Sequence, residues 1–552
     1  MLKKLLLWSL TCVVHSAVAQ QPPTGGAQIQ QIPPAPGLER SIPDIRVEKG
    51  GTPPASLSDS VRVRVDALRV TGQTVYSEAQ LISATNFRPG EFASSDLRAL
   101  AAQIGDYYHR NGYFAAQAYL PAQDVQAGSV TVNVLEGQYG SVVLRNSSAL
   151  SDNVAGGLLA GLSRGDTISI DPLERRLLLL SDLPGVVTKS RLVPGAAVGS
   201  ADLLVDVAPG PRVYGSVEAD NAGNRYTGEY RLGATVNISE LIGQGDLLSF
   251  RGLAAQGLAY GRLAYELQAG QGRVGVAYTA LDYRIGREFA ALNAHGTAEI
   301  ASVFGSYPII RSRKTNLYAL AGFDAKTFQD KVDFTGAVTD RKARVLVAGL
   351  YGDHRDELGG GGFTSYSLNV SSGRLDIETP GALAIDAATA RANGHYGKIG
   401  FHVLRLQNLG GPFSLYGSIR GQLASRNLDI SEKMELGGAY AVRAYPEGEA
   451  YADQGYVATA EVRMLLPKPS PSLPGQVHLV GFVDTGSVTI NKNPWVAGQN
   501  TRTLSAAGVG VTWSEHSNFI VKAYWAHKLG NATAISAPDA KSRVWVQLVK
   551  YF

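Results

Sequence analysis

Two short motifs contain the charged residues whose surroundings suggest a specific interaction. The first is Val442-Arg443-Ala444-Tyr445-Pro446, and the second is Phe482-Val483-Asp484-Thr485-Gly486. The second motif alternates as a strand, so Phe482, Asp484 and Gly486 share one face. A carboxylate on the polar face of a strand needs a partner, and an arginine offers a planar fork that can bind both carboxylate oxygens. We therefore expect an ion pair between Arg443 and Asp484; the alternative is that the two charges are unconnected.

The other patterns that could indicate chemistry do not fit their context. Gly270 to Gly275 spell GxGxxG, but a strand follows where dinucleotide binding requires a helix. Gly359 to Gly362 lack the Lys-Ser/Thr of a phosphate-binding loop, and His395 and His402 lack the spacing of a metal site. No serine stands in a G-x-S-x-G motif, and Cys12 is the only cysteine. We predict no enzymatic activity, no cofactor and no metal.

The composition narrows the class of protein. Among 552 residues there are 63 glycines, and charged residues make up only 18%, against about 25% in an average domain. This argues against disorder and against long solvated helices. The 25 tyrosines outnumber the 15 phenylalanines and 5 tryptophans together, which fits many strands that end in water. A net charge of +4 gives no support for a nucleic-acid partner.

The N-terminal residues have the pattern of a secretory signal. Two lysines precede an apolar stretch and the cleavage site Ala17-Val18-Ala19, so residues 1–19 are predicted to be a signal peptide. No later run of about 20 apolar residues follows, which leaves a soluble exported protein or a membrane β-barrel. Residues 20–60 are rich in proline and predict an extended, mobile periplasmic linker. Within it, Gln28 to Gln31 is too short to predict a helix.

Two consecutive units of one order follow the linker. Residues 61–137 are predicted as β-α-α-β-β, with a long helix that begins at Ser94 and has one apolar face. Residues 138–210 repeat this order, and Asp171-Pro172 provides the cap and first-turn proline of a helix. Two units of one size and order predict tandem α+β modules.

Residues 211–552 consist of strand-length segments separated by glycine, asparagine, aspartate and proline turns. The apolar residues of these segments alternate with polar or small ones. In a β-sandwich the apolar face would fill a closed interior, whereas here a glycine-rich polar face would line a wide lumen and the apolar face would meet lipid. We predict a mainly β fold, a sixteen-stranded antiparallel transmembrane β-barrel preceded by two small α+β modules. The predicted strands are 213–220, 228–238, 245–256, 259–270, 272–283, 297–310, 315–326, 341–352, 363–372, 396–407, 413–424, 455–466, 476–486, 502–514, 517–528 and 542–552.

The lengths of the connections predict the orientation of the barrel. If the first strand rises from the periplasm, the connections after odd strands are external and include the longest ones, such as 425–454. Long external and short periplasmic connections are the rule in outer-membrane barrels. Two connections do not fit, because 257–258 is external and short and 353–362 is periplasmic and long. The sixth external connection, 425–454, contains Arg443 and is predicted to fold into the lumen.

These modules, strands and motifs resemble the two-partner secretion transporters (TpsB), which have two POTRA domains before a sixteen-stranded barrel. Residues 442–446 resemble the VRGY motif of the wider superfamily, with Ala444 where that motif has glycine, and Phe482 to Gly486 match its FxDxG motif. The resemblance implies that Arg443 and Asp484 form a loop–barrel lock. It also implies supporting roles for the other residues of the two motifs, Val442, Tyr445, Phe482 and Gly486.

The resemblance also implies the function and the partners. The protein would be an outer-membrane transporter whose periplasmic POTRA modules capture a large TpsA-like exoprotein of haemolysin or adhesin type and export it without nucleotide hydrolysis. It would contact outer-membrane lipid, depend on the barrel-assembly machinery for insertion, and bind no nucleic acid. The main alternative is a barrel-assembly or insertion factor, which shares both motifs but usually has more modules. A passive porin would leave the modules unexplained.

Overall fold

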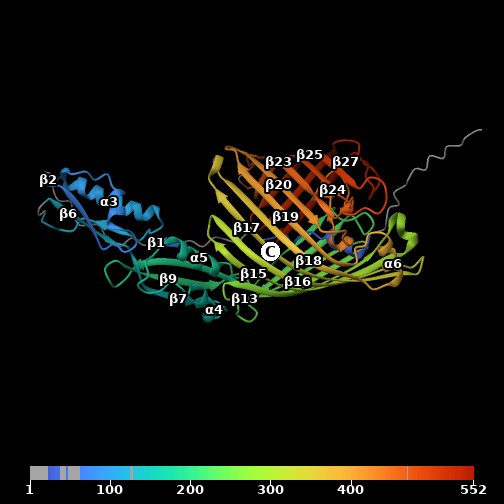
Figure 1. Ribbon diagram of the computed structural model, residues 1–552, viewed down its shortest axis with the longest axis horizontal. Helices are drawn as coiled ribbons and strands as arrows, with labels where there is room; N and C mark the ends of the chain where they lie inside the picture. Colours follow the sequence, from blue (N-terminus) through green and yellow to red (C-terminus); the bar gives the residue numbers. More distant parts are fainter. Residues whose placement is uncertain (1–22, 38–44, 48–61, 125–127, 469, 471) are drawn as a thin grey trace, which may run out of the picture.

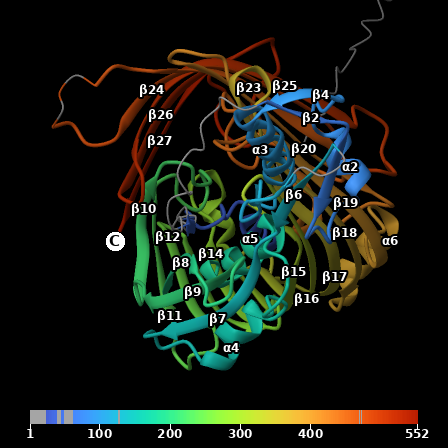
Figure 2. The same ribbon diagram turned by 90° about the vertical axis from the view of Figure 1, so that its left-hand side faces the viewer.

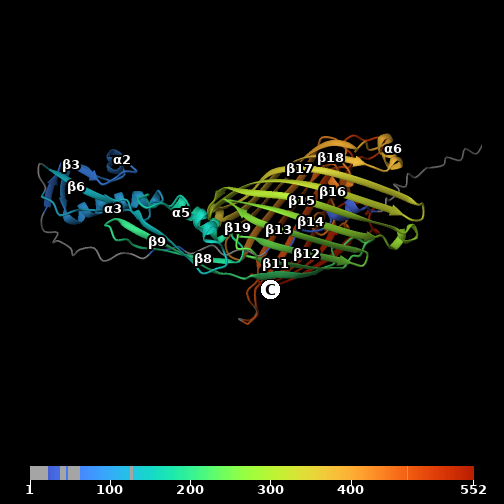
Figure 3. The same ribbon diagram turned by 90° about the horizontal axis from the view of Figure 1, so that it is seen from below.

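The computed structural model describes the chain except residues 1–22, 38–44, 48–61, 125–127, 469 and 471. The predicted signal peptide therefore lies outside the described residues, as does most of the linker. Two small modules extend from one end of a large barrel (Figure 1, Figure 3). Among the described residues, no helix is long and apolar enough to cross a membrane.

The first module packs two helices against small sheets. Its helices and strands are β2 (Arg62–Val65), β3 (Ala67–Thr71), α2 (Glu78–Ser83), β4 (Gly90–Ala93), α3 (Ser94–Arg110), β5 (Gln117–Tyr119) and β6 (Ser129–Leu135). Strand β6 lies between β3 and β5, and β2 pairs with β4. Helix α3 buries Leu97, Leu100, Ile104 and Tyr108 on one face, which is the face that the 3.6-residue period predicted.

The second module repeats the β3-α2-α3-β5-β6 order of the first, without a described counterpart of the β2–β4 pair. It consists of β7 (Gln138–Asn146), α4 (Asp152–Leu159), α5 (Ile170–Ser181), β8 (Val186–Pro194) and β9 (Ser200–Pro209). Its core contains the fully buried Leu173, Leu177 and Leu180 of α5. A short strand from the linker, β1 (Ile45–Val47), pairs in parallel with β8 and completes the sheet order β1-β8-β9-β7.

Sixteen antiparallel strands form a closed barrel, so the predicted fold class is confirmed. Each strand corresponds to one that the alternation predicted. The strands are β10 (Val213–Asp220), β11 (Arg231–Ser239), β12 (Leu247–Ala255), β13 (Leu258–Ala269), β14 (Gly272–Arg284), β15 (Ala294–Arg311), β16 (Thr315–Val332), β17 (Ala337–Asp356), β18 (Gly362–Ile377), β19 (Gly394–Asn408), β20 (Phe413–Ala424), β23 (Gln454–Leu465), β24 (Gln476–Thr489), β25 (Thr501–Glu515), β26 (Phe519–Lys528) and β27 (Ser542–Tyr551). Strand β10 pairs with β27 and closes the barrel.

The strands differ in length more than the sequence predicted. Strand β10 has 8 residues, whereas β17 has 20. Because β17 and β18 are longer than expected, the periplasmic connection predicted at 353–362 shortens to 357–361. For the same reason the external connection predicted at 327–340 is the tight turn 333–336, since β16 and β17 continue as a hydrogen-bonded pair beyond the predicted strand ends.

The second module docks on the periplasmic turns of the barrel. Two guanidinium nitrogens of Arg311 lie 2.7 and 2.8 Å from the carboxylate oxygens of Asp182. Arg175 of α5 donates to the carbonyl oxygen of Pro308 at 2.8 Å, and Ser151 N donates to Gly243 O at 2.8 Å. These contacts lie in the even-numbered connection after β11 and at the end of β15 that precedes the next even-numbered one, which agrees with the predicted periplasmic side.

The linker contains a helix that the sequence did not predict. Helix α1 (Gly25–Gln30) lies inside the barrel, where Figure 2 shows the N-terminal segment in dark blue. Gly25 N donates to Asp330 Oδ1 at 2.9 Å, and Thr227 donates to the side chain of Gln28 at 2.8 Å. Two glycines make this a weak helix former, so its stability comes from contacts with the lumen.

Gly26 of α1 packs closely against Ser431 of the 425–453 loop. A Cβ atom on Gly26 would lie 2.9 Å from Ser431 Cβ, so Gly26→Leu should displace α1. The measurement is maleimide labelling of Ala27→Cys, because Ala27 is fully buried. The thiol should be unreactive in the parent protein and reactive after Gly26→Leu. Gly37→Leu is the control, since a Cβ there meets nothing within 4 Å; equal protection in both variants would contradict the packing.

Candidate functional site

The loop between β20 and β23 folds into the lumen of the barrel. It contains η3 (Ile430–Glu432) and a small hairpin of β21 (Met434–Glu435) and β22 (Tyr451–Ala452). Apolar residues at the tip of this loop pack against the inner wall of β23 to β26, with Leu436, Val442, Ala444 and Tyr445 completely buried. The loop therefore fills part of the lumen instead of extending outward.

Arg443 lies at the tip of the loop and contacts Asp484 through three hydrogen bonds. Its Nε donates to Oδ2 and its Nη2 to Oδ1, each at 2.8 Å, and its backbone N donates to Oδ2 at 3.1 Å. Thr459 Oγ1 also donates to Asp484 Oδ1 at 2.9 Å. The side chain of Asp484 is 0% exposed and that of Arg443 6%. The pair is bidentate, buried and formed by the two residues that the motifs singled out.

Arg443 is also held by residues that the sequence did not indicate. Glu461 Oε1 accepts from Arg443 Nη1 at 2.9 Å, and Trp545 Nε1 donates to Arg443 O at 2.6 Å. The guanidinium carbon lies 3.4 Å from the centre of the Phe482 ring, a cation–π contact. Alternation indicates that one face of a strand is polar, but it does not say which polar residue meets the loop.

The supporting motif residues have separate contacts. Tyr445 donates through its hydroxyl to Ala532 O at 3.1 Å. A Cβ on Gly486 would lie 2.5 Å from Leu436 Cδ1, so the loop packs directly on the backbone of this glycine. The backbone of Ala444 is not in the left-handed region, and alanine therefore fits the position of the motif glycine.

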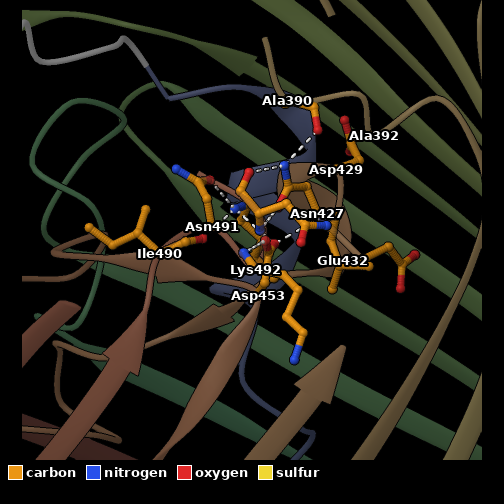
Figure 4. A network of polar contacts seen from close by, with 12 residues as sticks. Ala390, Ala392, Asn427, Asp429, Glu432, Asp453, Ile490, Asn491 and Lys492 are labelled. Carbon is orange, nitrogen blue, oxygen red and sulfur yellow. Dashed lines mark hydrogen bonds and ion pairs between the residues drawn. The ribbon is translucent and has the colours of Figure 1, made fainter. Parts of the chain in front are cut away.

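The two ends of the loop are also tied to neighbouring external segments (Figure 4). Asn427 Nδ2 donates to Ala390 O at 2.7 Å. Asp453 accepts from Leu428 N at 3.0 Å and from Lys492 N at 2.7 Å. Asp453 is 0% exposed. Its buried charge is satisfied by these fixed donors and by the Lys433 ammonium at 2.8 Å.

Two carboxyl groups of the loop, Glu435 and Glu447, face each other, and the charges of Arg231 and Arg420 offset only part of the effect of their burial. Glu447 accepts from Ala439 N at 2.8 Å, and Glu435 accepts from Gly448 N. Burial raises the pKa of Glu447. Burial and the neighbouring Glu447 also raise the pKa of Glu435. The docked loop therefore favours protonated carboxyl groups at this point.

Replacing Arg443 by lysine should release the tip of the loop, because an ammonium cannot reproduce the two parallel bonds to Asp484. Breaking a buried ion pair costs about 3–5 kcal/mol. Limited proteolysis with mass spectrometry should detect new cleavage within 425–453, while the heat-dependent gel shift shows that the barrel is still folded. Glu461→Gln is the control, since the bonds to Asp484 remain. A lysine variant as resistant as the parent would contradict this role.

Raising the pH should loosen the hairpin of the loop. Because the docked pair has a raised pKa, the docked loop binds protons that the released loop gives up. The stabilisation is complete below the ordinary glutamate pKa of 4.5 and is lost as the pH rises through the raised value. Hydrogen exchange at 433–453, corrected for intrinsic rate, should be slower at about pH 5 than at about pH 8. The double variant Glu435→Gln/Glu447→Gln should remove most of this dependence, and an unchanged profile would argue against it.

Comparisons with known proteins agree with the fold and identify the family. Residues 199–513 match the family described as haemolysin secretion/activation protein ShlB/FhaC/HecB, and residues 63–137 match the ShlB-type POTRA domain. The chain is 30% identical over 499 residues to the heme/hemopexin transporter protein HuxB of Haemophilus influenzae, covering 89% of this chain and 86% of that protein. It is 22% identical over 429 residues to the outer membrane transporter CdiB of Dickeya dadantii, covering 75% and 74%.

Solved structures share the same fold. CdiB from Escherichia coli aligns with a TM-score of 0.70 at 19% identity, covering 91% of this chain and 93% of that one. BamA from Haemophilus ducreyi, lacking POTRA domains 1–3, aligns with a TM-score of 0.53 at 14% identity, covering 89% and 100%. Together with the closed barrel and the two preceding modules, the family match leads to one conclusion. The chain belongs to the ShlB/FhaC/HecB family of two-partner secretion transporters, with its barrel in the outer membrane and its POTRA modules in the periplasm.

Proposed function

We propose that this protein exports one large partner exoprotein, of haemolysin or adhesin type, to the cell surface without nucleotide hydrolysis. The observation that carries the proposal is the pairing of β1 with β8, because it identifies a module edge that accepts an extended segment from outside the module. Strand addition suits an unfolded client, since main-chain hydrogen bonds require little sequence match. The curated relatives HuxB and CdiB, both named as transporters, support this proposal.

In this proposal the client displaces β1 from the edge of β8. The pairing involves only three residues, with Ile45 opposite Ser190, Arg46 opposite Arg191 and Val47 opposite Leu192. A longer client strand would form more hydrogen bonds along the nine residues of β8 and would therefore compete successfully. The captured chain then enters the lumen from the periplasmic side.

The loop–barrel lock has a positioning role in the same proposal. Arg443 and Asp484 hold the 425–453 loop against the wall, and Val442, Tyr445, Phe482 and Gly486 shape the contact. The lock keeps the loop in one place while the client passes. Its burial and bidentate geometry support this assignment, because buried ion pairs are best attested as devices that fix position.

The proposal also covers the division of the chain and its surroundings. The signal peptide is residues 1–19, the linker 20–60, the POTRA modules 61–137 and 138–210, and the barrel 211–552. Outward residues such as Val276 and Leu346, which are more than half exposed, contact outer-membrane lipid. The barrel-assembly machinery inserts the protein.

Fixing β1 on β8 should block secretion. Arg46 and Arg191 are register partners, and neighbouring strands bring Cα atoms within the range of a disulfide. The double variant Arg46→Cys/Arg191→Cys should secrete little of the exoprotein encoded beside this chain under oxidising conditions and recover after reduction. The measurement is secreted partner relative to barrel abundance.

Each single cysteine variant serves as a control, because the only native cysteine, Cys12, lies in the predicted signal peptide. Normal secretion from a fully oxidised double variant would show that the β8 edge is not the site of capture.

A further inference from the structure

A row of hydrogen-bonding side chains crosses the inner wall of the barrel at one register. Strand pairing places these residues opposite one another in sequence around the wall, from β27 through β10 to β14. We call this set the polar row: Tyr551, Ser216, Thr235, Arg251, Arg262 and Thr279.

The polar row faces a cavity of about 610 Å³ whose opposite side is residues 32–37 of the same chain. Proline fixes φ and restricts the preceding residue to extended conformations, so this segment is extended. Pro33, Pro34 and Pro36 have no N–H, and their carbonyl oxygens are the only main-chain groups that need partners.

The wall binds this segment through its carbonyl oxygens at both ends. Arg231 Nη1 donates to Gln31 O at 3.0 Å, and Tyr551 of the polar row donates to Gly37 O at 3.3 Å. The resting protein therefore already shows an extended polypeptide held along this wall by donors to its main chain.

Two members of the polar row are buried yet incompletely bonded. Arg251 and Thr235, which are register partners, are each 6% exposed. Arg251 Nη2 donates to Glu218 at 2.7 Å, but its Nε and Nη1, and Thr235 Oγ1, find no partner among the residues that the structure describes. Burying such groups without a partner costs on the order of 1–3 kcal/mol each, so these donors point to a ligand that enters the cavity.

The chemistry of the row favours a main chain over a small anion. Glu218 already balances the charge of Arg251, and Arg262 Nη1 donates to Thr279 Oγ1 at 3.1 Å. The remaining donors are hydroxyl and guanidinium N–H groups, which suit neutral carbonyl oxygens.

We propose that the polar row is a binding track for the main chain of the exported partner, whose carbonyl oxygens take these donors once residues 31–37 leave the wall. This inference rests on the proposed export function. It adds the part of the lumen wall to which the partner binds. Because the contacts are to the backbone, the track accepts an unfolded chain of any sequence.

Photo-crosslinking in secreting cells tests the track. A photoreactive residue replaces Asn237, which lines this cavity, or Asn369, which lines a different cavity on β18. The probe is the epitope-tagged exoprotein encoded beside this chain. Position 237 should crosslink to the probe several-fold more than position 369. Equal or stronger crosslinking at 369, or none at 237 while the probe is secreted, would overturn the track.

A hydroxyl deletion gives a second measurement. Thr235→Val keeps the side-chain shape and should reduce secreted probe per folded barrel by roughly two- to tenfold, the range expected for one net hydrogen bond. Thr327→Val, on the outward face of β16, should have no effect; equal secretion from both variants would count against the track. If the unaltered protein does not secrete the probe at all, the proposed export function fails. Failure of the track alone instead leaves secretion by the unaltered protein intact.

Discussion

The requirement that every backbone polar group within the bilayer be hydrogen-bonded determines the rest of this structure. With no water in the hydrocarbon region, a sheet can cross only as a closed barrel. Closure at β10 and β27 and the two-residue period of strands then assign each side chain to lipid or to the lumen. A sixteen-stranded barrel is too wide for its own side chains to fill. The lumen is occupied instead by α1 and the 425–453 loop.

Both occupants are held by charged and polar contacts in addition to apolar packing. Arg341 contacts Asp330 of the wall and Asp429 of the loop, and Asp330 also accepts from Gly25 N of α1. Lys326 and Lys398 both contact Glu432 of the loop. Buried ion pairs are weak evidence for stability, since desolvation offsets much of their attraction. Ion pairs do fix the position of the loop and of α1. When two charged groups separate into water, less apolar surface is exposed than when two apolar surfaces separate.

Alternation predicted all sixteen strands because successive side chains of a barrel strand face lipid and the lumen in turn. It did not predict strand ends, since β16 and β17 continue pairing beyond the predicted ends, where contacts such as Gln329 Nε2 to Asp340 Oδ1 form only in the folded barrel. Helix α1 was missed because Gly25 and Gly26 disfavour a helix that exists through contacts with Asp330 and Ser431. The motifs indicated Arg443 and Asp484, whereas Glu461 and Trp545 come from strands whose meeting point depends on the folded loop.

The unequal strand lengths have a consequence for the surrounding lipid. A strand needs roughly 9–11 residues to cross a bilayer, and β10 has 8 whereas β17 has 20. The surplus length of β17 extends beyond the hydrocarbon region, whereas lipid beside the short β10 must thin to match it. Thinning imposes an elastic load on one side of the molecule, the side where β10 lies.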